Sequence, residues 1–155
     1  MPIRSISEYF EKNAVRYRAQ NHLHVITAPE VAQTTHTPGR LLAKTVILKA
    51  DGDLVMAVLP ADRKIDFDML KVAMGAHELR LAKEDEFGDR FPDCEVGGMP
   101  PFGNLYDMPV VLEQALTEIP WVAFNAGTHT EIVKMDMSDL VQLTNPMICS
   151  FTVLH

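Results

Sequence analysis

The sequence predicts an α+β protein in which short helices surround a mixed β-sheet. Strand-like and helix-like segments follow one another without a regular β-α-β order, which argues against a doubly wound parallel sheet. Two apolar runs are separated by Asp51-Gly52, a dipeptide typical of tight hairpin turns, and this indicates antiparallel pairing. The 155 residues, 47% hydrophobic and 23% charged, fit one compact domain over residues 1–155.

The N-terminal part is expected to contain a helix, two strands and a second helix. Ser5 and Glu8 have the spacing of a capping box and predict a helix over residues 5–13. Pro29 suits the first turn of another short helix, which ends before Pro38-Gly39. Between these helices, alternation of apolar and polar residues favours short strands at residues 15–17 and 23–26.

The central part is expected to form a hairpin followed by a helix. Residues 41–49 and 54–59 flank the turn at Asp51-Gly52 and are predicted to be its two strands. Asp66 can cap a helix that ends near Gly75. The buried side of this helix is expected to carry Phe67, Leu70, Val72, Ala73 and Met74.

A long loop is predicted in the C-terminal half. After a short helix at residues 82–87, residues 88–109 contain four glycines and four prolines and show no periodicity. Loops of this length inside a compact domain are uncommon and usually functional. The remaining elements are expected to be a strand at 109–112, a short helical stretch, strands at 121–124 and 131–135, and a helix at 138–143.

Composition narrows the function classes. The net charge of -7 argues against a protein that wraps nucleic acid through a broad basic face, so a nucleic acid would have to be held at one end or by a few basic residues. No apolar run approaches the roughly 20 residues needed to cross a membrane, and residues 1–10 lack the apolar centre of a signal peptide. Cys94 and Cys149 make no disulfide framework, so we expect a cytoplasmic protein with free thiols.

Lys44 is the first candidate for chemistry. It lies in an apolar strand, where alternation places it on the same face as Leu42, Val46 and Leu48. An ammonium group desolvated at such a position is costly without a partner. The pattern leaves two interpretations open: an edge-strand lysine that extends to water, or a cation directed into a pocket for a phosphate, carboxylate or carbonyl.

The second candidate is a glycine- and proline-rich segment of the long loop. Glycines let the backbone approach a ligand and direct amides at an oxyanion, and prolines restrict the loop to few conformations. This composition suits a preformed pocket wall, although a rigid connecting loop is equally compatible with it. The segment matches neither a phosphate-binding loop nor a dinucleotide fingerprint. It consists of Gly97, Gly98, Met99, Pro100, Pro101, Phe102 and Gly103.

Other reactive residues are weaker candidates. Three histidines could suggest a metal site, namely His22, His24 and His36. Their spacing is not diagnostic, so we expect surface histidines, no metal and no cofactor. Cys94 is a poor nucleophile because the neighbouring carboxylates of Asp93 and Glu95 oppose thiolate formation. His129 follows a strand and a glycine turn and could reach a pocket.

Four segments, in this order, resemble the YbaK/prolyl-tRNA-synthetase-associated editing family over residues 20–145. They are Ala43-Lys44-Thr45-Val46, Leu59-Pro60-Ala61-Asp62, residues 91–103, and Phe124-Asn125-Ala126-Gly127-Thr128-His129. The resemblance implies a mixed, mainly antiparallel, barrel-like sheet surrounded by short helices. It also implies a trans-acting deacylase that hydrolyses the ester between a wrong amino acid and the terminal adenosine of a tRNA.

The resemblance assigns roles to the candidate residues. Lys44 matches the family's lysine, which is expected to hold the terminal nucleotide or the ester region of the substrate. Residues 97–101 match a Gly-x-x-x-Pro loop that borders the aminoacyl pocket, where Gly98 and Met99 would help to set its size. His129 matches a pocket histidine found in some members. The implied partners are the acceptor end of aminoacyl-tRNA and a synthetase, with no membrane and no DNA.

Such a reaction requires no strong nucleophile and no metal. An aminoacyl ester is already activated, so a site mainly has to position a water molecule and stabilise the developing oxyanion. The water can be assisted by the substrate's ribose hydroxyl or by a backbone carbonyl, while Lys44 anchors the substrate. Alanyl-, cysteinyl-, seryl- and threonyl-tRNA all remain open as substrates. The alternative function is a non-catalytic module that binds a nucleotide or an aminoacyl-tRNA.

Overall fold

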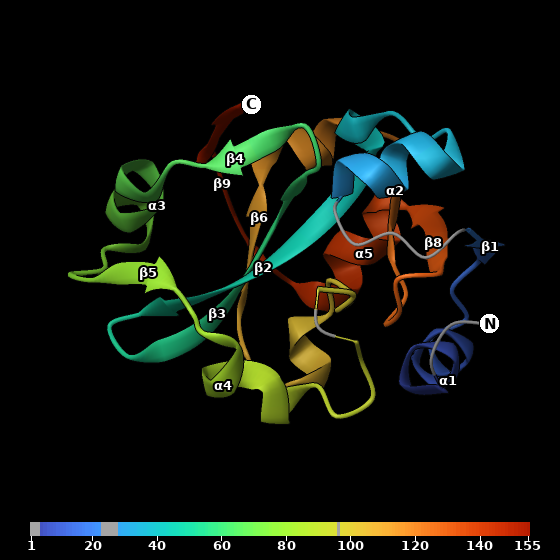
Figure 1. Cartoon of the computed structure of the whole chain (residues 1–155), viewed down its shortest axis with the longest axis horizontal. Helices are drawn as coiled ribbons and strands as arrows, with labels where there is room; N and C mark the ends of the chain where they lie inside the picture. Colours follow the sequence, from blue (N-terminus) through green and yellow to red (C-terminus); the bar gives the residue numbers. More distant parts are fainter. Residues whose placement is uncertain (1–3, 23–27, 96) are drawn as a thin grey trace.

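The computed structural model describes residues 4–22, 28–95 and 97–155 (Figure 1). Its α-helices are short: α1 (Arg4–Lys12), α2 (Ala28–Thr35), α3 (Phe67–Met74), α4 (Glu84–Phe87) and α5 (Met137–Thr144). Single turns of 3-10 helix are η1 (Gly39–Leu41), η2 (Gly88–Arg90), η3 (Gly103–Leu105) and η4 (Gln114–Glu118). None of the described helices is long and apolar enough to cross a membrane.

Most strands belong to one mixed sheet, which confirms the predicted α+β class. Its order is β1-β8-β7-β2-β3-β6-β9, and β5 also pairs with β2. The pairs β1/β8, β7/β8, β2/β3 and β2/β5 are antiparallel, whereas β2/β7, β3/β6 and β6/β9 are parallel. The strands are β1 (Tyr17–Asn21), β2 (Leu42–Ala50), β3 (Asp53–Pro60), β5 (Leu79–Leu81), β6 (Val110–Glu113), β7 (Trp121–Asn125), β8 (Glu131–Asp136) and β9 (Met147–Cys149).

The hairpin and the capped helix form as predicted. Asp51 and Gly52 both have positive φ angles, 49° and 87°, so the turn fits the twist of the β2/β3 pair. The carboxylate of Asp66 accepts a hydrogen bond from the backbone N–H of Met69 at the start of α3. Gly75 ends the helix in the left-handed conformation.

Several details differ from the sequence prediction. Val72, expected on the buried side of α3, is 81% exposed, because the short helix buries only Leu70 fully. The strand expected at residues 15–17 is β1, which begins at Tyr17, and the one expected at 23–26 lies outside the described residues. Patterning missed β5 and β9 as well as β4 (Arg63–Ile65) and β10 (Thr152–Leu154), which pair with each other. Each of these has three residues, too few to show a period.

Both faces of the large sheet carry packed cores. On one face α1, α5 and the long loop pack around a large core that contains Phe10, Phe102, Phe124 and Leu140. The other face carries two smaller cores: one is formed with α3 and includes Leu48, Leu59 and Leu70, and the other is formed with α2 and includes Val31, Leu42 and Ala123. Along β2, Lys44 therefore lies between the two smaller cores.

Candidate functional site

The sheet has a gap next to Lys44. Strand β2 pairs with β7 only at Leu42 and Ala43, and with β5 only from Leu48 onward. Between these two stretches, no described strand pairs with this side of β2. The predicted edge-strand interpretation of Lys44 therefore does not apply, because β2 lies inside the sheet and Lys44 beside an internal opening.

Main-chain groups of Thr45 face this gap. The backbone N–H of Ala61 donates to the carbonyl of Leu42, so the even-numbered residues of β2 bond to β3. Odd-numbered residues direct their N–H and C=O groups to the other side, as shown by the bond from the Ala82 N–H to the Ile47 carbonyl. Thr45 is also odd-numbered, and it lies opposite the interruption. Its N–H and C=O are thus positioned to bond a ligand in the gap.

A small cavity of about 120 Å³ occupies the gap. Lys44 and Asn125 line it from neighbouring strands, and Gly97 and Met99 line it from the long loop. The remaining lining residues are Ala28, Ala43, Thr45 and Val46. The two candidates from the sequence, a lysine in an apolar strand and a glycine-rich loop, therefore contribute to the same cavity.

The ammonium group of Lys44 is partly desolvated. Burial lowers the pKa of Lys44, and the negative charge of Asp62 acts in the opposite direction. The Nζ atom lies 3.1 Å from the Nε2 atom of His155, at hydrogen-bond distance. A cation in this setting is hydrated less than a surface lysine, so an anionic or carbonyl oxygen in the cavity would interact with it more strongly.

Asn125 is a site residue that sequence reasoning missed. It ends β7, and because Ala43 is aligned with Phe124, Asn125 lies beside Lys44 on the same face of the sheet. Its side-chain Oδ1 atom is buried and has no hydrogen-bond partner among the described residues. Buried polar atoms are nearly always paired, so an unpaired carboxamide oxygen in a cavity is suited to accept a hydrogen bond from a ligand. Asn125 belongs to a segment that resembles the editing family, but sequence reasoning assigned it no role, because its place beside Lys44 depends on the parallel β2/β7 register.

Hydrogen bonds to residues 127–129 hold the cavity end of the long loop in place. The Glu95 N–H donates to the Gly127 carbonyl at 2.8 Å, and the Gly127 N–H donates to the Gly98 carbonyl at 2.9 Å. The Glu95 carboxylate accepts a hydrogen bond from the His129 N–H at 3.0 Å. A Cβ at Gly98 would lie 3.1–3.2 Å from Thr128 backbone atoms, so this contact favours glycine. These three hydrogen bonds hold Glu95 and Gly98, and so restrict the position of Gly97 between them.

The rest of the predicted segment anchors the loop in the core. Phe102 is fully buried, and its ring packs edge-on against Phe10 and Phe124. A Cβ at Gly103 would lie 2.7 Å from the Met108 carbonyl oxygen, so only glycine fits. The residues of the segment that do not line the cavity are Gly98, Pro100, Pro101, Phe102 and Gly103, and all of them are buried.

His129 lies behind the loop. The residue is 5% exposed, and a Cβ added at Gly97 would be 3.1 Å from the Cε1 atom of its ring. It is absent from the described residues that line the cavity. The ring therefore contacts the wall of the cavity at Gly97 and supports it from the far side.

The other reactive candidates lie apart from this cavity. Burial raises the pKa of Cys94 to about 12, and its sulfur contacts the hydroxyl of Tyr106 and the carboxylate of Asp93. A thiol with such a pKa is protonated at neutral pH and is a poor nucleophile, in agreement with the sequence prediction. The described residues contain no group of three His, Cys, Asp or Glu side chains that could hold a metal. His24 lies outside the described residues.

Comparisons with known proteins agree with this arrangement. A family model described as "Aminoacyl-tRNA editing domain" matches residues 22–143. The proline--tRNA ligase of Thermosipho africanus is 31% identical over 80 residues, and that of Heliobacterium modesticaldum is 37% identical over 89 residues. These matches cover 52% and 56% of this chain but only 14% and 15% of the ligases, so the chain corresponds to a small part of those relatives.

Solved structures share the fold over nearly the whole chain. The hypothetical protein APE2540 superposes with a TM-score of 0.86 and 20% sequence identity, covering 97% of this chain and all of that one. A protein described as a candidate trans-editing enzyme for prolyl tRNA synthetase superposes with a TM-score of 0.83 and 19% identity, covering 97% and 96% of the two chains. With a family model that matches most of its length, this chain belongs to the aminoacyl-tRNA editing domain family.

Proposed function

We propose that this protein is a trans-acting deacylase that hydrolyses the ester bond of mischarged aminoacyl-tRNA. The observation that carries the proposal is the cavity that Lys44 lines together with the loop residues Gly97 and Met99. Membership of the editing-domain family supports it, as does the similarity to part of two proline--tRNA ligases. The partner is the acceptor end of the charged tRNA, encountered in the cytoplasm with or without a synthetase.

Lys44 would bind the oxygen-rich end of the substrate. Its side chain brings a positive charge into a partly desolvated position, where it can hold a phosphate of the terminal nucleotide or polarise the ester carbonyl. The Thr45 N–H, which faces the same gap, can donate to the developing oxyanion. Backbone amides of this kind are already oriented, so they stabilise the transition state without reorganisation.

The hydrolysis requires no protein nucleophile. A water molecule attacks the carbonyl carbon of the ester, the bond from this carbon to the ribose oxygen breaks, and the water's proton passes to that oxygen. The Thr45 carbonyl or the substrate's own ribose hydroxyl can orient the water. The high pKa of Cys94 is compatible with this route, because a thiol held protonated would not compete with water.

The cavity would bind a small amino acid. A volume of about 120 Å³ corresponds to about four water molecules at liquid density, which suits an alanyl-, cysteinyl-, seryl- or threonyl-sized group. Asn125 would accept a hydrogen bond from the substrate's α-ammonium group, and Met99 would limit the length of the side chain. The flexible thioether of Met99 can adapt to small differences, so the side-chain preference is expected to be graded.

A deacylation panel tests this function. Transfer RNAs charged with amino acids of increasing size are incubated with the full chain, and the rate of ester loss is compared with the rate in buffer. We expect acceleration for small amino acids and none for aromatic ones. If no charged tRNA is hydrolysed faster than in buffer but aminoacyl-tRNA still binds at the Lys44 cavity, the protein is the non-catalytic binding module and the enzymatic proposal is wrong.

A further inference from the structure

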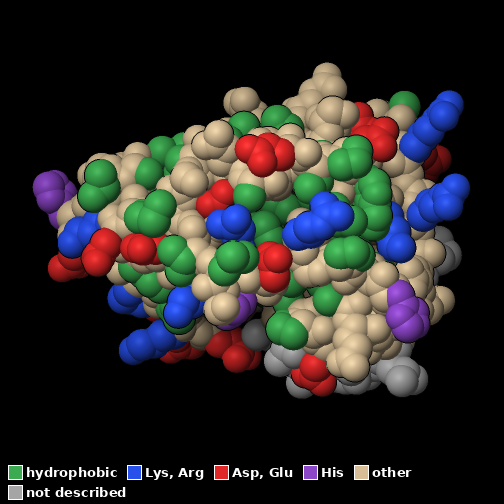
Figure 2. All heavy atoms as spheres, turned by 90° about the horizontal axis from the view of Figure 1, so that it is seen from above, with side chains coloured by type: hydrophobic (Ala, Val, Ile, Leu, Met, Phe, Trp, Pro, Cys, Tyr) green, Lys and Arg blue, Asp and Glu red, His purple; other side chains and the backbone are tan. Residues whose placement is uncertain are grey.

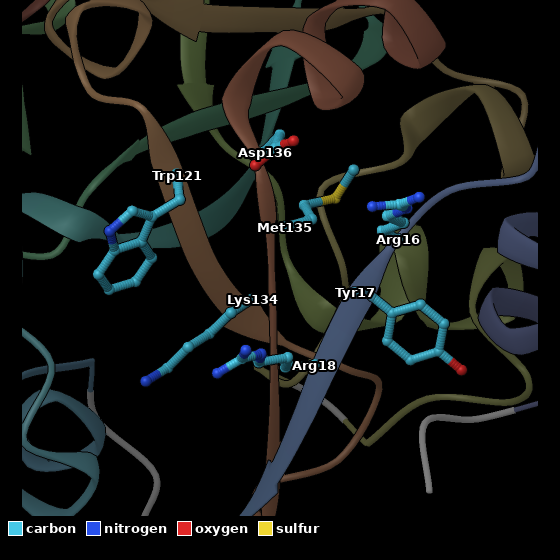
Figure 3. A pocket seen from close by; sticks show the side chains of 7 residues that line it. All are labelled: Arg16, Tyr17, Arg18, Trp121, Lys134, Met135 and Asp136. Atoms are coloured by element: carbon cyan, nitrogen blue, oxygen red, sulfur yellow. The ribbon is translucent and has the colours of Figure 1, made fainter.

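A second hollow lies on the same face of the sheet as Lys44, over β1, β8 and β7 (Figure 3). It is lined by Arg16, Arg18, Lys134 and Trp121, together with Tyr17, Met135 and Asp136. We call the first four residues the basic shelf. Figure 3 shows the side chains of Arg18 and Lys134 extending from neighbouring strands in the same direction, with the indole ring of Trp121 beside Lys134.

The charges of the basic shelf are close together and have no ion-pair partner among the described residues. Arg18 and Lys134 are directly opposite each other in the β1/β8 register, an arrangement that is unfavourable for like charges. None of the three cations of the shelf forms an ion pair with a residue in the described part of the chain. In a protein with a net charge of -7, this local excess of positive charge indicates an external anion.

Trp121 adds an aromatic surface to the shelf. The Lys134 Nζ atom lies 5.4 Å from the centre of the Trp121 ring, within the range of a cation–π contact. The ring is only partly buried, against the core formed with α2. Cations next to an accessible aromatic ring are typical of surfaces that bind single-stranded nucleic acid, where phosphates meet the charges and a base stacks on the ring.

The geometry of the sheet connects the shelf with the cavity. Lys134 is aligned with Ala123, two residues before Asn125 on β7, and cross-strand partners share a face. With about 3.3 Å per residue and about 4.8 Å between strands, Lys134 and Arg18 lie about 8 to 12 Å from Asn125 along the sheet. A few nucleotides of an RNA strand span this distance. On the face shown in Figure 2, acidic and basic side chains are interspersed.

We infer that the basic shelf binds the sugar-phosphate backbone of the RNA strand whose 3′ end enters the Lys44 cavity. The inference rests on the proposed deacylase function and adds a second contact region to it. Arg16, Arg18 and Lys134 neutralise phosphates, and Trp121 stacks on an unpaired base. Binding is electrostatic and independent of base sequence in the stem, because phosphate contacts position a nucleic acid without reading it.

The first test measures RNA affinity as a function of salt. The probe is an uncharged hairpin RNA with a base-paired stem and a single-stranded 3′ end, and the readout is fluorescence anisotropy. We compare Arg18→Ala/Lys134→Ala with the control Lys64→Ala/Lys71→Ala, which removes the same charge from two exposed lysines outside the shelf. The shelf variant is expected to bind at least tenfold more weakly at 0.1 M salt. The slope of its log affinity against log salt concentration should be smaller in magnitude by about two. Equal losses in both variants, or no binding by the native chain, overturn the inference.

Two single substitutions sharpen this result. Trp121→Leu keeps an apolar side chain against the α2 core and removes the ring, so it should weaken binding of the overhanging RNA about tenfold and leave a blunt hairpin unaffected. Asp136→Asn removes the acidic group that lines the hollow and should strengthen binding of both RNAs. If a short polyphosphate competes as well as the overhanging RNA, the shelf is a general anion site and the RNA assignment is wrong.

A small substrate separates this inference from the proposed function. Aminoacyl-adenosine carries the ester but lacks the preceding nucleotides, so the shelf variant should hydrolyse it at the native rate while hydrolysing charged tRNA more slowly. If the native chain hydrolyses neither substrate but still binds RNA through the shelf, the deacylase proposal fails and the shelf assignment stands. If the shelf variant loses both reactions equally, the shelf assignment fails.

Discussion

Lys44 and Asn125 lie beside each other on the parallel strands β2 and β7 and line one cavity. One contributes a partly desolvated cation, and the other a buried carboxamide oxygen without a described partner. Side chains of these two kinds can bind opposite ends of an aminoacyl ester, whose carbonyl attracts a cation and whose α-ammonium group needs an acceptor. Their roles can be separated because they are expected to respond differently to substitution.

Lys44→Ala is expected to lower kcat/KM for deacylation about 100-fold or more, as for the loss of an electrostatic contact in a transition state. Folding stability should be unchanged or higher, because a half-buried cation is removed. Single-turnover deacylation and urea unfolding measure the two quantities. Lys71→Ala, at an exposed position on α3, is the matched control. Native activity in Lys44→Ala would exclude our role for this residue.

Asn125→Ala is expected to lower deacylation about three- to tenfold, corresponding to the loss of about one hydrogen bond to the substrate. The free energy of unfolding should not decrease, since the Oδ1 atom has no described partner to lose. The effect should vanish with a substrate analogue whose α-amino group is replaced by hydrogen. A clear loss of stability would instead indicate a structural role for the carboxamide.

Gly97→Ala should impair the site in two ways. Gly97 has a φ angle of 84°, which is strained for alanine, and the new Cβ would crowd the His129 ring at 3.1 Å. Gly52→Ala is a matched control, because φ is 87° there but no atom lies within 4 Å of the added Cβ. Both variants should lose about 1 kcal/mol or more of stability, and only Gly97→Ala should also lose deacylation. Urea unfolding and the tRNA assay check this, and equal activities in the two variants would contradict it.

Glu113 is expected to make stability depend on pH. Burial alone would raise its pKa, but hydrogen bonds from the backbone N–H groups of Ala115, Phe151 and Thr152 and from the Thr152 hydroxyl outweigh burial and lower it. With a lowered pKa in the folded state, the carboxylate stabilises the fold above its unfolded pKa of about 4.3, and this contribution is lost as the pH falls further.

Glu113→Gln measures that contribution. The variant should unfold more easily at pH 7, by about 1.5–3 kcal/mol, which is typical for hydrogen bonds to a charged group. It should also lose less stability than the native chain when the pH is lowered below about 5. Urea unfolding at a series of pH values provides both comparisons. If the free energy of unfolding depends on pH in the same way in both proteins, the Glu113 carboxylate is not the source of the pH dependence.

The sequence could predict those features whose cause lies within a few neighbouring residues. Asp51-Gly52 requires only a turn of the correct hand, and the helix between Asp66 and Gly75 carries its own caps. Lys44 was identified for a similar reason, because a cation in an apolar strand is unusual over a few residues. These features could be predicted because the physical cause and the signal lie in the same short stretch of chain.

Features that depend on distant pairing could not be predicted. Asn125 becomes a cavity residue only through the parallel pairing of Ala43 with Phe124, which are far apart in the sequence. Likewise, Arg18 meets Lys134 only through the β1/β8 register, and nothing in either segment alone indicates a shared surface. Val72 shows the opposite limit, because helical spacing predicted its burial, whereas no element among the described residues covers that side of α3.

Main-chain groups contribute to the cavity, because Thr45 directs its N–H and C=O to the opening between β2 and β7. Peptide groups are the same whichever side chain is attached, so point mutations leave this part of the chemistry intact. Mutations at Met99 or Asn125 would instead change the walls. Under the proposed function, the same main-chain groups would therefore serve different amino acid preferences, with each change confined to one or two side chains.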